Sequence, residues 1–402
     1  MTNNTLCGLV VDRLVKKLTD GDSADRLNLF FSFQERGEKR VSEGLRPILE
    51  KETQVLSDLS ERLKTVTAEI EVMNSEADSE AGWSNPRTWR ADANYAALVA
   101  RSVALHVEKY FLSAGNETGD GSGPRFRFSC LNHENAYLSN FPHQFTQRTL
   151  LARFQVNNTS PPFVQFVKKP VFLVYGLMGL LGDQLLQPSV TLANESNVRI
   201  IATSSHDNQR NQKAYSFLVV NSLDQPGELA NGSVRVNLTL NFSLSDLNYE
   251  WRMSRYTVDN VRTNPYKVWK EQGSRPFFTH RLLSSMRAKS EPVADASAQA
   301  VDIKVSADGF DHQTHLSFDL PLPAVTLILI CSKADSAPEK VRNVRGVTVN
   351  EFEVLLLWSA SKSRCLKTYE VEFADAAASG SRRFERVSGE SLLFASFNYL
   401  RE

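Results

Sequence analysis

The chain has 402 residues, of which 42% are hydrophobic and 23% are charged, a balance typical of globular domains with apolar cores. Its 46 Lys and Arg residues equal its 46 Asp and Glu residues, so the composition lacks the basic footprint of a nucleic-acid-binding protein. The longest apolar run, residues 170–182, is broken by glycines and is too short to span a bilayer. Residues 1–14 show neither the basic nor the apolar region of a signal peptide, so we expect none in this chain.

Residues 1–182 alternate predicted helices with predicted strands. In the helix predicted over 41–66, leucines recur three, four or seven residues apart, which places them on one face. The other predicted helices cover 7–18, 92–112 and 170–182, and the predicted strands cover 26–33, 69–74 and 125–131. Strands that alternate with helices form a parallel sheet. Because three such strands alone would leave long edges unpaired, we interpret 1–182 as the last three βα units of a larger fold.

The remaining chain changes in character after residue 182. Residues 183–335 contain alternating apolar and polar runs with turn residues between them, which predicts an antiparallel β-sandwich. Within this region, residues 288–302 are small and polar, and we expect a loop there. Residues 336–402 read as the first strands of a fibronectin-III or immunoglobulin-like module. They are too few for its seven strands, so we expect an incomplete module.

Cysteines beside strands and an excess of glycosylation sequons favour an oxidising, secretory compartment, and the alternative for any single sequon is an unused polar triplet on the surface. Cys331 and Cys365 each lie beside a predicted strand. Spacing alone does not fix which of the four cysteines pair, and we predict a disulfide between these two. The eight Asn-x-Ser/Thr sequons are about twice the number expected by chance from the composition. They begin at Asn3, Asn116, Asn157, Asn158, Asn194, Asn231, Asn237 and Asn241.

Polar side chains cluster where the three predicted parallel strands end. In parallel barrels the working residues lie at these ends. Carboxylates and guanidinium groups suit a polyhydroxyl, anionic substrate, and a glutamate at a strand end is the usual nucleophile of retaining glycosidases. On pattern alone, a helix cap or surface acid is the commoner role for Glu76, and a surface ion pair for Arg148. The cluster comprises Gln34, Glu35 and Arg36, then Asn74, Ser75 and Glu76, then Asn132, His133, Glu134 and Asn135, with Arg148 in the next loop.

The only close pair of histidines is His312 and His315. A strand would place their rings on opposite faces, and no carboxylate partner pattern accompanies them. We therefore expect no metal site, and the sequence indicates no cofactor.

Several longer stretches resemble glycoside hydrolase family 39. The most specific are residues 74–99, NSEADSEAGWSNPRTWRADANYAALV, and residues 147–171, QRTLLARFQVNNTSPPFVQFVKKPV. The resemblance runs from about residue 20 to the end of the chain. It implies the C-terminal part of a (β/α)8 TIM barrel over 1–182, a β-sandwich over 183–335 and an incomplete fibronectin-III-like module over 336–402. It also implies a lysosomal enzyme that removes terminal iduronic acid from two glycosaminoglycans, dermatan sulfate and heparan sulfate.

The resemblance also implies roles for individual residues. Glu76 falls on the family's nucleophile. Arg148 and the backbone of Gly82 fall where the uronate carboxylate is held. Glu134 falls on an aspartate that contacts sugar hydroxyls. Asn157 falls on a glycosylated asparagine near the cleft, and family sequons are also matched at Asn116, Asn194 and Asn231.

Besides Glu134 in place of an aspartate, the chain departs from the family pattern in two places. Gln34-Glu35-Arg36 replaces a His-x-Lys motif, so Arg36 keeps the cation for substrate binding without the same point-charge geometry. The family's acid/base glutamate lies after barrel strand four, and no such strand occurs in these residues. We therefore interpret the chain as part of a retaining glycosidase that is inactive alone. The alternative is a truncated, non-catalytic paralogue that binds glycosaminoglycan or protein.

Overall fold

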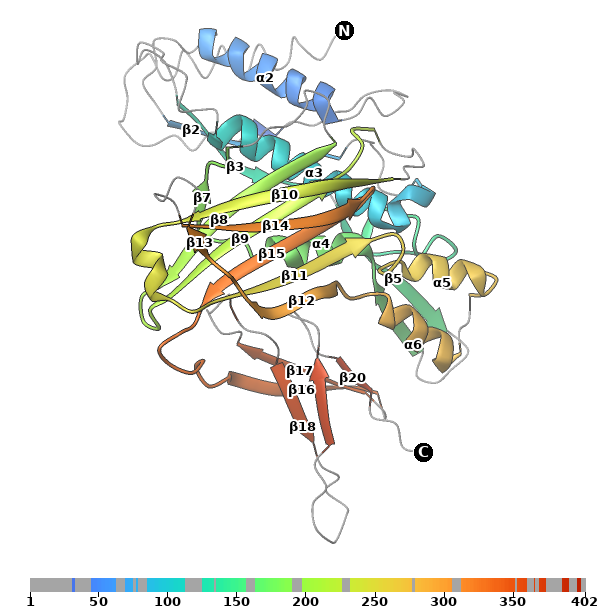
Figure 1. Cartoon of the computed structure of the whole chain (residues 1–402). Coiled ribbons are helices and arrows are strands. Elements are labelled where there is room, and N and C mark those ends of the chain that lie inside the picture. The colour runs from blue at the N-terminus through green and yellow to red at the C-terminus, as the bar shows by residue number, and fades with distance from the viewer. Residues whose placement is uncertain are drawn as a thin grey trace, which may run out of the picture.

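The computed structural model places parallel strands at one end of the molecule, two antiparallel sheets in the middle and small β-sheets at the other end (Figure 1). In the described part of the chain, no helix combines the length and the hydropathy needed to cross a membrane. The structure describes residues 31–32, 45–62, 69–74, 77–78, 85–112, 125–133, 135–156, 163–189, 197–225, 232–276, 279–305, 312–350, 353–359, 365, 369–373, 385–389 and 396–398.

The first sheet has three strands in the order β1-β2-β3, and both pairings are parallel. Helix α2 (Leu45–Arg62) lies between β1 and β2 in the sequence, and helix α3 (Ala93–Val107) lies between β2 and β3. The parallel pairing predicted from the alternation of strands and helices is confirmed. The strands are β1 (Phe31–Ser32), β2 (Glu69–Asn74) and β3 (Arg125–Leu131).

The two helices of this part are explained by their sequences. Helix α2 buries the leucine face expected from its periodicity, including Leu56 and Leu59. Helix α3 begins at an N-cap, because the Asp92 carboxylate accepts a hydrogen bond of 2.9 Å from the Asn94 amide. A 3₁₀ turn, η1 (Thr88–Ala91), precedes α3, and a π-helical turn, η2 (Glu108–Leu112), follows it.

Residues 136–168 form a second small sheet, which was not predicted from the sequence. Strand β5 (Thr149–Val156) pairs in parallel with β4 (Ala136–Leu138) and antiparallel with β6 (Phe163–Lys168). Helix α4 (Pro170–Met178) follows, with proline in the first turn, where its missing N–H has no intrahelical partner to lose.

The largest sheet has six strands in the order β12-β11-β15-β9-β8-β7, and its pairings are antiparallel. Strands β9 and β15 are central, and most of their residues are buried. The strands are β7 (Gln184–Leu186), β8 (Val198–Asp207), β9 (Gln212–Asn221), β11 (Trp251–Asp259), β12 (Val293–Ala300) and β15 (Ala324–Ser332).

The prediction of a loop over residues 288–302 is wrong, because strand β12 occupies most of that range. This strand pairs with β11, where Ala294 lies opposite Tyr256 and Ala296 opposite Arg255. The small and polar residues of β12 do not show the apolar pattern expected of a strand. An edge strand can form without that pattern, because it needs few large apolar side chains. The pairing partner, β11, lies more than thirty residues upstream, so local composition does not reveal it.

A three-stranded antiparallel sheet covers one face of the large sheet. Its order is β10-β14-β13, with β10 at one edge (Figure 1). Val236 and Phe318 of this sheet share a core with Phe217 and Ile328 of the large sheet. The strands are β10 (Ser233–Phe242), β13 (Lys304–Val305) and β14 (His312–Pro321), and the 3₁₀ turn η4 (Leu244–Asn248) follows β10.

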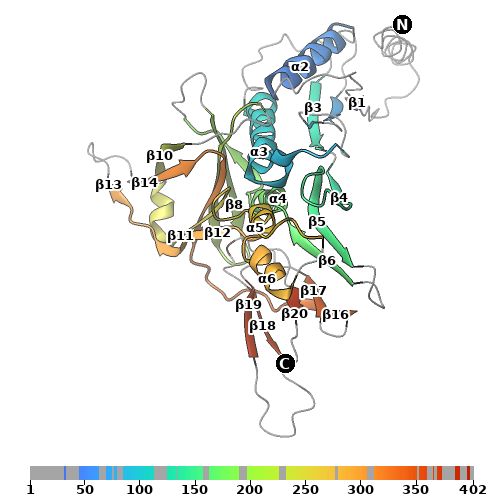
Figure 2. The same ribbon diagram turned by 90° about the vertical axis from the view of Figure 1, so that its right-hand side faces the viewer.

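Two helices, α5 (Pro265–Glu271) and α6 (His280–Ala288), pack beside the β5–β6 hairpin (Figure 2). Trp269 of α5 and Met286 of α6 share a buried cluster with Phe154 of β5. This contact attaches the hairpin that follows Arg148 to the turn and helices that follow β11.

The carboxyl-terminal strands form two small sheets. One has the order β16-β17-β20, and the other pairs β18 with β19. The predicted disulfide between Cys331, in β15, and Cys365 is present, with 5.9 Å between the Cα atoms. The strands are β16 (Arg342–Asn350), β17 (Glu353–Ser359), β18 (Tyr369–Phe373), β19 (Glu385–Gly389) and β20 (Ser396–Asn398).

One hydrophobic core contains residues from both sides of position 182, where the composition of the sequence changes. It joins helix α3 and helix α4 to four strands of the large sheet. Tyr95 and Val174 from the helices meet Leu218, Val258 and Leu327 from the strands. The helical part and the large sheet are therefore one packed body.

Candidate active site

The carboxyl ends of β2 and β3 are hydrogen-bonded to each other beyond the regular ladder. The Asn132 N–H donates to the Asn74 carbonyl at 2.8 Å, and the Ala77 N–H donates to the Asn132 carbonyl at 2.8 Å. Both distances are those of strong backbone hydrogen bonds. The chain on either side of residues 75–76 is therefore attached to the end of β3.

The buried carboxylate of Asp78 contacts three side chains at this end of the sheet. The Tyr95 hydroxyl donates to Asp78 Oδ2 at 2.7 Å. Asp78 Oδ1 lies 3.6 Å from Arg90 Nη2 and 3.5 Å from Arg148 Nη1. Arg90, Tyr95 and Arg148 are at most 2% exposed. Two guanidinium groups and one carboxylate therefore meet two residues after Glu76 in the sequence.

A second pair of contacts extends this cluster toward β3. The Tyr95 hydroxyl also lies 3.1 Å from Asn135 Oδ1, and the Tyr175 hydroxyl lies 3.4 Å from His133 Nδ1. Burial is the main cause that lowers the pKa of His133 to about 3, and the charges of His106 and Arg148 act in the same direction. Burial also raises the pKa of Tyr175 to about 12. Both groups are therefore neutral hydrogen-bonding partners at physiological pH.

A buried polar cluster supports β2 from the helical side. Glu52 of α2 accepts a hydrogen bond from the Asn74 side-chain amide and lies 3.1 Å from His106 Nε2 through its Oε2 atom. The Tyr110 hydroxyl donates to the same Oε2 at 3.2 Å. Glu52 is 2% exposed, which is unusual for a glutamate and is explained by these three partners.

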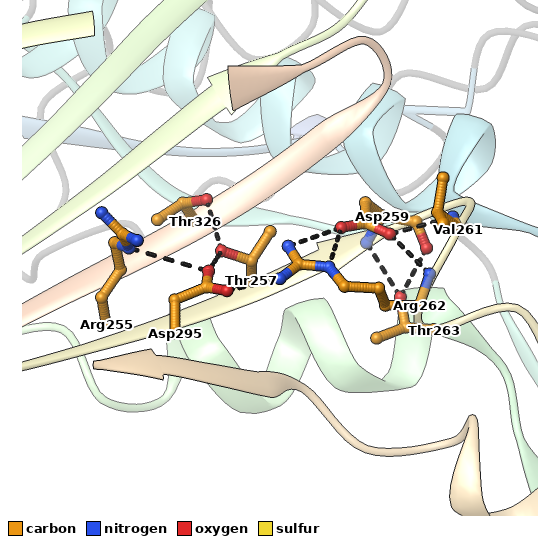
Figure 3. Close-up of polar contacts among 8 residues, drawn as sticks. All are labelled: Arg255, Thr257, Asp259, Val261, Arg262, Thr263, Asp295 and Thr326. Atoms are coloured by element: carbon orange, nitrogen blue, oxygen red, sulfur yellow. Dashed lines mark hydrogen bonds and ion pairs between the residues drawn. The ribbon is translucent and has the colours of Figure 1, made fainter. Parts of the chain in front are cut away.

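The large sheet holds the start of α3. The Ala93 N–H donates to Asn260 Oδ1 at 2.7 Å, and Asn260 lies in the turn after β11. Asp259 shapes this turn by accepting hydrogen bonds from the Val261 N–H at 2.9 Å and the Arg262 N–H at 2.7 Å. Figure 3 shows the Arg262 guanidinium between the Asp259 and Asp295 carboxylates. This network fixes the chain three residues after Arg90.

A buried lysine fixes the main chain next to Arg148. Lys169 Nζ donates to the Gln147 carbonyl at 2.7 Å, and its side chain is fully buried. Burial is the main cause that lowers the pKa of Lys169 well below its usual range, and the Arg90 charge adds to the effect, while the Asp92 charge opposes it. Arg148 is thus held through its own ion pair and through the backbone of its neighbour.

Of the residues predicted for substrate binding or catalysis, Arg148 lies within the described part and belongs to this cluster. Its ion-pair partner Asp78, and the two other side chains that contact Asp78, Arg90 and Tyr95, were not predicted as site residues. The stretch NSEAD did carry the signal, because it places an aspartate two residues after Glu76. Outside the described residues lie Arg36, Glu76, Gly82 and Glu134, and the sequon asparagines Asn116, Asn157, Asn194 and Asn231.

Within the described ranges, no group of three or more His, Cys, Asp or Glu side chains is placed to hold a metal ion. His312 and His315 both lie on β14, where His315 Nδ1 is 3.0 Å from the Thr239 hydroxyl.

Two curated α-L-iduronidases are similar to most of this chain. The Mus musculus enzyme is 33% identical over 334 residues, which cover 81% of this chain and 50% of that protein. The Homo sapiens enzyme is 34% identical over 334 residues, which cover 81% of this chain and 48% of that protein. The chain therefore spans about half the length of the curated relatives it matches.

The chain is also similar to a solved structure and to a model of a protein family. The structure is of the bacterial orthologue of human α-L-iduronidase, which matches with a TM-score of 0.73 and 20% identity over 97% of this chain and 64% of that one. The family described as "Glycosyl hydrolases family 39" matches residues 33–305, which is more than half of the chain. The chain belongs to glycosyl hydrolases family 39.

Proposed function

We propose that this chain is part of a retaining glycosidase that removes terminal iduronic acid from dermatan sulfate and heparan sulfate. Membership of family 39 and the fold of the solved relative imply a TIM-barrel catalytic domain, to which β1, β2, β3 and their helices correspond. The similar curated proteins are named α-L-iduronidases, which supports iduronic acid as the substrate. The chain covers 50% and 48% of these two relatives, so the activity is proposed for a longer enzyme of which this chain is part.

Glu76 is the proposed nucleophile. The main support is that the chain is anchored on both sides of it, through the Asn74–Asn132 pair before it and through Asp78 after it. A nucleophile has to be held in one position relative to the anomeric carbon, and buried hydrogen bonds and ion pairs supply that rigidity. The end of a parallel strand is where barrel enzymes place such residues.

The proposed reaction has two steps. The Glu76 carboxylate attacks the anomeric carbon and forms an ester with it, while the bond to the leaving sugar oxygen breaks and an acid glutamate elsewhere in the whole enzyme protonates that oxygen. Water then attacks the same carbon, and the second glutamate accepts its proton. Because two displacements occur at one carbon, the configuration of the sugar is retained.

Substrate recognition is proposed to use the charges near this strand end. Arg148 is the proposed partner of the uronate carboxylate, together with the backbone of Gly82, and Glu134 and Arg36 are proposed contacts to the sugar. A planar guanidinium binds a carboxylate through two parallel hydrogen bonds. The Asp78 ion pair orients the Arg148 guanidinium in the described structure, which supports a pre-positioned role.

The other sequence-based assignments remain proposals. They are a β-sandwich over 183–335, an incomplete fibronectin-III-like module over 336–402 and a lysosomal location reached through the secretory pathway. The disulfide between Cys331 and Cys365 supports an oxidising compartment. Glycans are proposed at Asn116, Asn157, Asn194 and Asn231.

The nucleophile is tested in the longer enzyme with a fluorinated iduronosyl fluoride, which forms the glycosyl-enzyme but hydrolyses slowly. Peptide mass mapping should find the label on Glu76. The Glu76→Gln variant is nearly isosteric, so it should fold, lose the label and lose at least about 10³-fold in kcat.

Glu80→Gln is the matched control, because Glu80 lies only four residues after Glu76 in the sequence. This variant should keep its label and its activity. A label on Glu80, or a Glu76→Gln enzyme that keeps most of its kcat, would show that the assignment is wrong.

A further inference from the structure

Two sequons that the family resemblance leaves without a role lie on strand β10. They are Asn237-Leu238-Thr239 and Asn241-Phe242-Ser243. Both asparagines are exposed, and so are the hydroxyl residues Thr239 and Ser243 that complete the sequons. From the position of these side chains we propose that Asn237 and Asn241 both carry N-linked oligosaccharides. The inference rests on the secretory route proposed above.

The strand's alternation separates the sequons from the core. Val236 and Phe242 are buried in the core shared with the large sheet, and Leu238 and Leu240 pack against it. Successive side chains of a strand point to opposite faces, so the sequon asparagines share the outer face. A glycan on either residue therefore extends into solvent and displaces no core side chain.

The outer face around the sequons is polar. Opposite Asn237 and Thr239 on the neighbouring strand β14 lie Ser317 and His315, both exposed. Two residues before Asn237 along the strand, Arg235 and its opposite residue Asp319 form an exposed ion pair of 3.1 Å. The core pentasaccharide of an N-linked glycan is hydrophilic, so this face accommodates it without covering apolar surface.

The hydrogen bond between the Ser317 and Asn237 side chains uses the Asn237 oxygen and not the nitrogen to which a glycan attaches. The Ser317 hydroxyl donates to Asn237 Oδ1, and the glycan attaches to the other terminal atom, Nδ2. Asn237 and Asn241 are four residues apart on one strand face, which separates them by about 13 Å. Two chains can therefore be attached at the same time.

The modification also suits the position of β10 in its sheet. Strand β10 is ten residues long and lies at one edge of the described β10-β14-β13 order. Long edge strands can pair with other chains unless they are blocked by charge, proline or covering groups. Bulky hydrophilic chains beside the edge hinder a second strand from approaching.

The chemical step is the transfer of an oligosaccharide from a lipid-linked oligosaccharide diphosphate. The asparagine amide nitrogen forms a bond to the first sugar carbon, and the bond from that carbon to the diphosphate oxygen breaks. The amide loses one proton to a base of the transferase, and the lipid diphosphate leaves. The step occurs on the extended chain before folding, so folded-state hydrogen bonds of Thr239 do not prevent it.

The test expresses the full chain behind a secretory signal sequence in a eukaryotic cell. Trypsin should release one peptide, residues 236–252, that contains both sites, because trypsin cleaves after Arg235 and after Arg252. Enzymatic release of N-glycans in heavy-oxygen water converts each occupied asparagine to labelled aspartate. We expect two labelled positions in this peptide, at Asn237 and Asn241.

Two substitutions at one position provide matched controls. Thr239→Ser keeps the sequon and should keep the label at Asn237. Thr239→Val has nearly the same shape but removes the sequon hydroxyl, so it should lose that label and leave the label at Asn241 unchanged. Labels that do not follow this pattern would show that the signal is spontaneous deamidation.

Occupancy at the other sequons separates this inference from the broader proposal. Label at Asn157 with an unlabelled 236–252 peptide would overturn the inference for β10 and leave the glycoprotein proposal standing. An absence of label at every sequon would overturn both. Neither result bears on Glu76, whose role is tested by the trapped glycosyl-enzyme.

Discussion

At the scale of single residues, the site is built from charged and polar groups that are almost completely buried. Glu52, Asp78, Arg90 and Arg148 are each less than 9% exposed, and each has an opposite charge or a hydrogen-bonding partner. Burial of such groups without partners would cost several kcal/mol. Their partners lie on different elements, so the cluster also fixes how those elements meet.

His133 makes part of this structure sensitive to acid. Its pKa of about 3 in the folded protein lies below the ordinary value of 6.5, so the unfolded chain binds the proton more readily between these pH values. Stability from this group is complete above about pH 6.5 and is lost as the pH falls toward 3. His133→Gln should reduce the loss of unfolding free energy between pH 7 and pH 4.5 by about 2 kcal/mol.

Urea unfolding of both proteins at the two pH values measures this difference. At pH 7 the variant should be slightly less stable, since it replaces the ring that lies beside the Tyr175 hydroxyl. The prediction is contradicted if the two proteins lose the same free energy on acidification.

At the scale of elements, the connection from α4 to the large sheet leaves no room for a side chain. A Cβ atom on Gly182 would lie 2.2 Å from the carbonyl oxygen of Ser204 in β8. The obstacle is backbone, so rotation of a side chain cannot relieve it. Gly182→Ala should lower the free energy of unfolding by about 2–4 kcal/mol through displacement of β8 or of the connection.

Gly179→Ala is the matched control, three residues away at the end of α4. There a Cβ atom would lie 3.3 Å from the nearest atom, the Gly176 carbonyl oxygen, and the backbone φ is −62°. This variant should change the unfolding free energy by less than about 1 kcal/mol. Similar thermal unfolding temperatures for the two variants would refute the steric argument.

The elements also show how far sequence patterns reach. The strands predicted over 69–74 and 125–131 match β2 and β3, because buried parallel strands are short apolar or alternating runs. Strand β12 was not predicted, because its pairing partner β11 is distant in sequence. The strands of the β4–β6 sheet pair with their neighbours in sequence, and they were also not predicted. In the site, Arg148 was predicted from family resemblance. Arg90 and Tyr95, which contact the same Asp78 carboxylate, were not predicted, because their approach to Asp78 depends on how η1 and α3 pack.

At the scale of the whole molecule, one covalent link joins the large sheet to the carboxyl-terminal strands. Cys331 and Cys365 are 34 residues apart in sequence. Closing a loop of this length should stabilise the folded state by about 3–4 kcal/mol in the chain-entropy model. The double variant Cys331→Ser/Cys365→Ser should lose about that much in denaturant unfolding, and added reductant should then change nothing further.

Cys130→Ser serves as the control for this measurement. Cys130 is an exposed free thiol on β3, so its substitution should leave the unfolding midpoint unchanged in oxidising buffer. Equal midpoints for the wild-type protein and the double variant would mean that the link contributes no stability.

The core shared by α3, α4 and the large sheet has a consequence for the order of folding during synthesis. Tyr95 and Leu327 belong to one buried cluster, although 232 residues separate them in sequence. When a ribosome has produced α3 and α4, the strands β9, β11 and β15 that cover their apolar faces have not yet emerged. Until these strands are synthesised, the apolar faces of the two helices stay exposed. Chains with exposed hydrophobic surface are prone to aggregate or to bind chaperones. The apolar faces of α3 and α4 are therefore fully covered only after β15 has been synthesised.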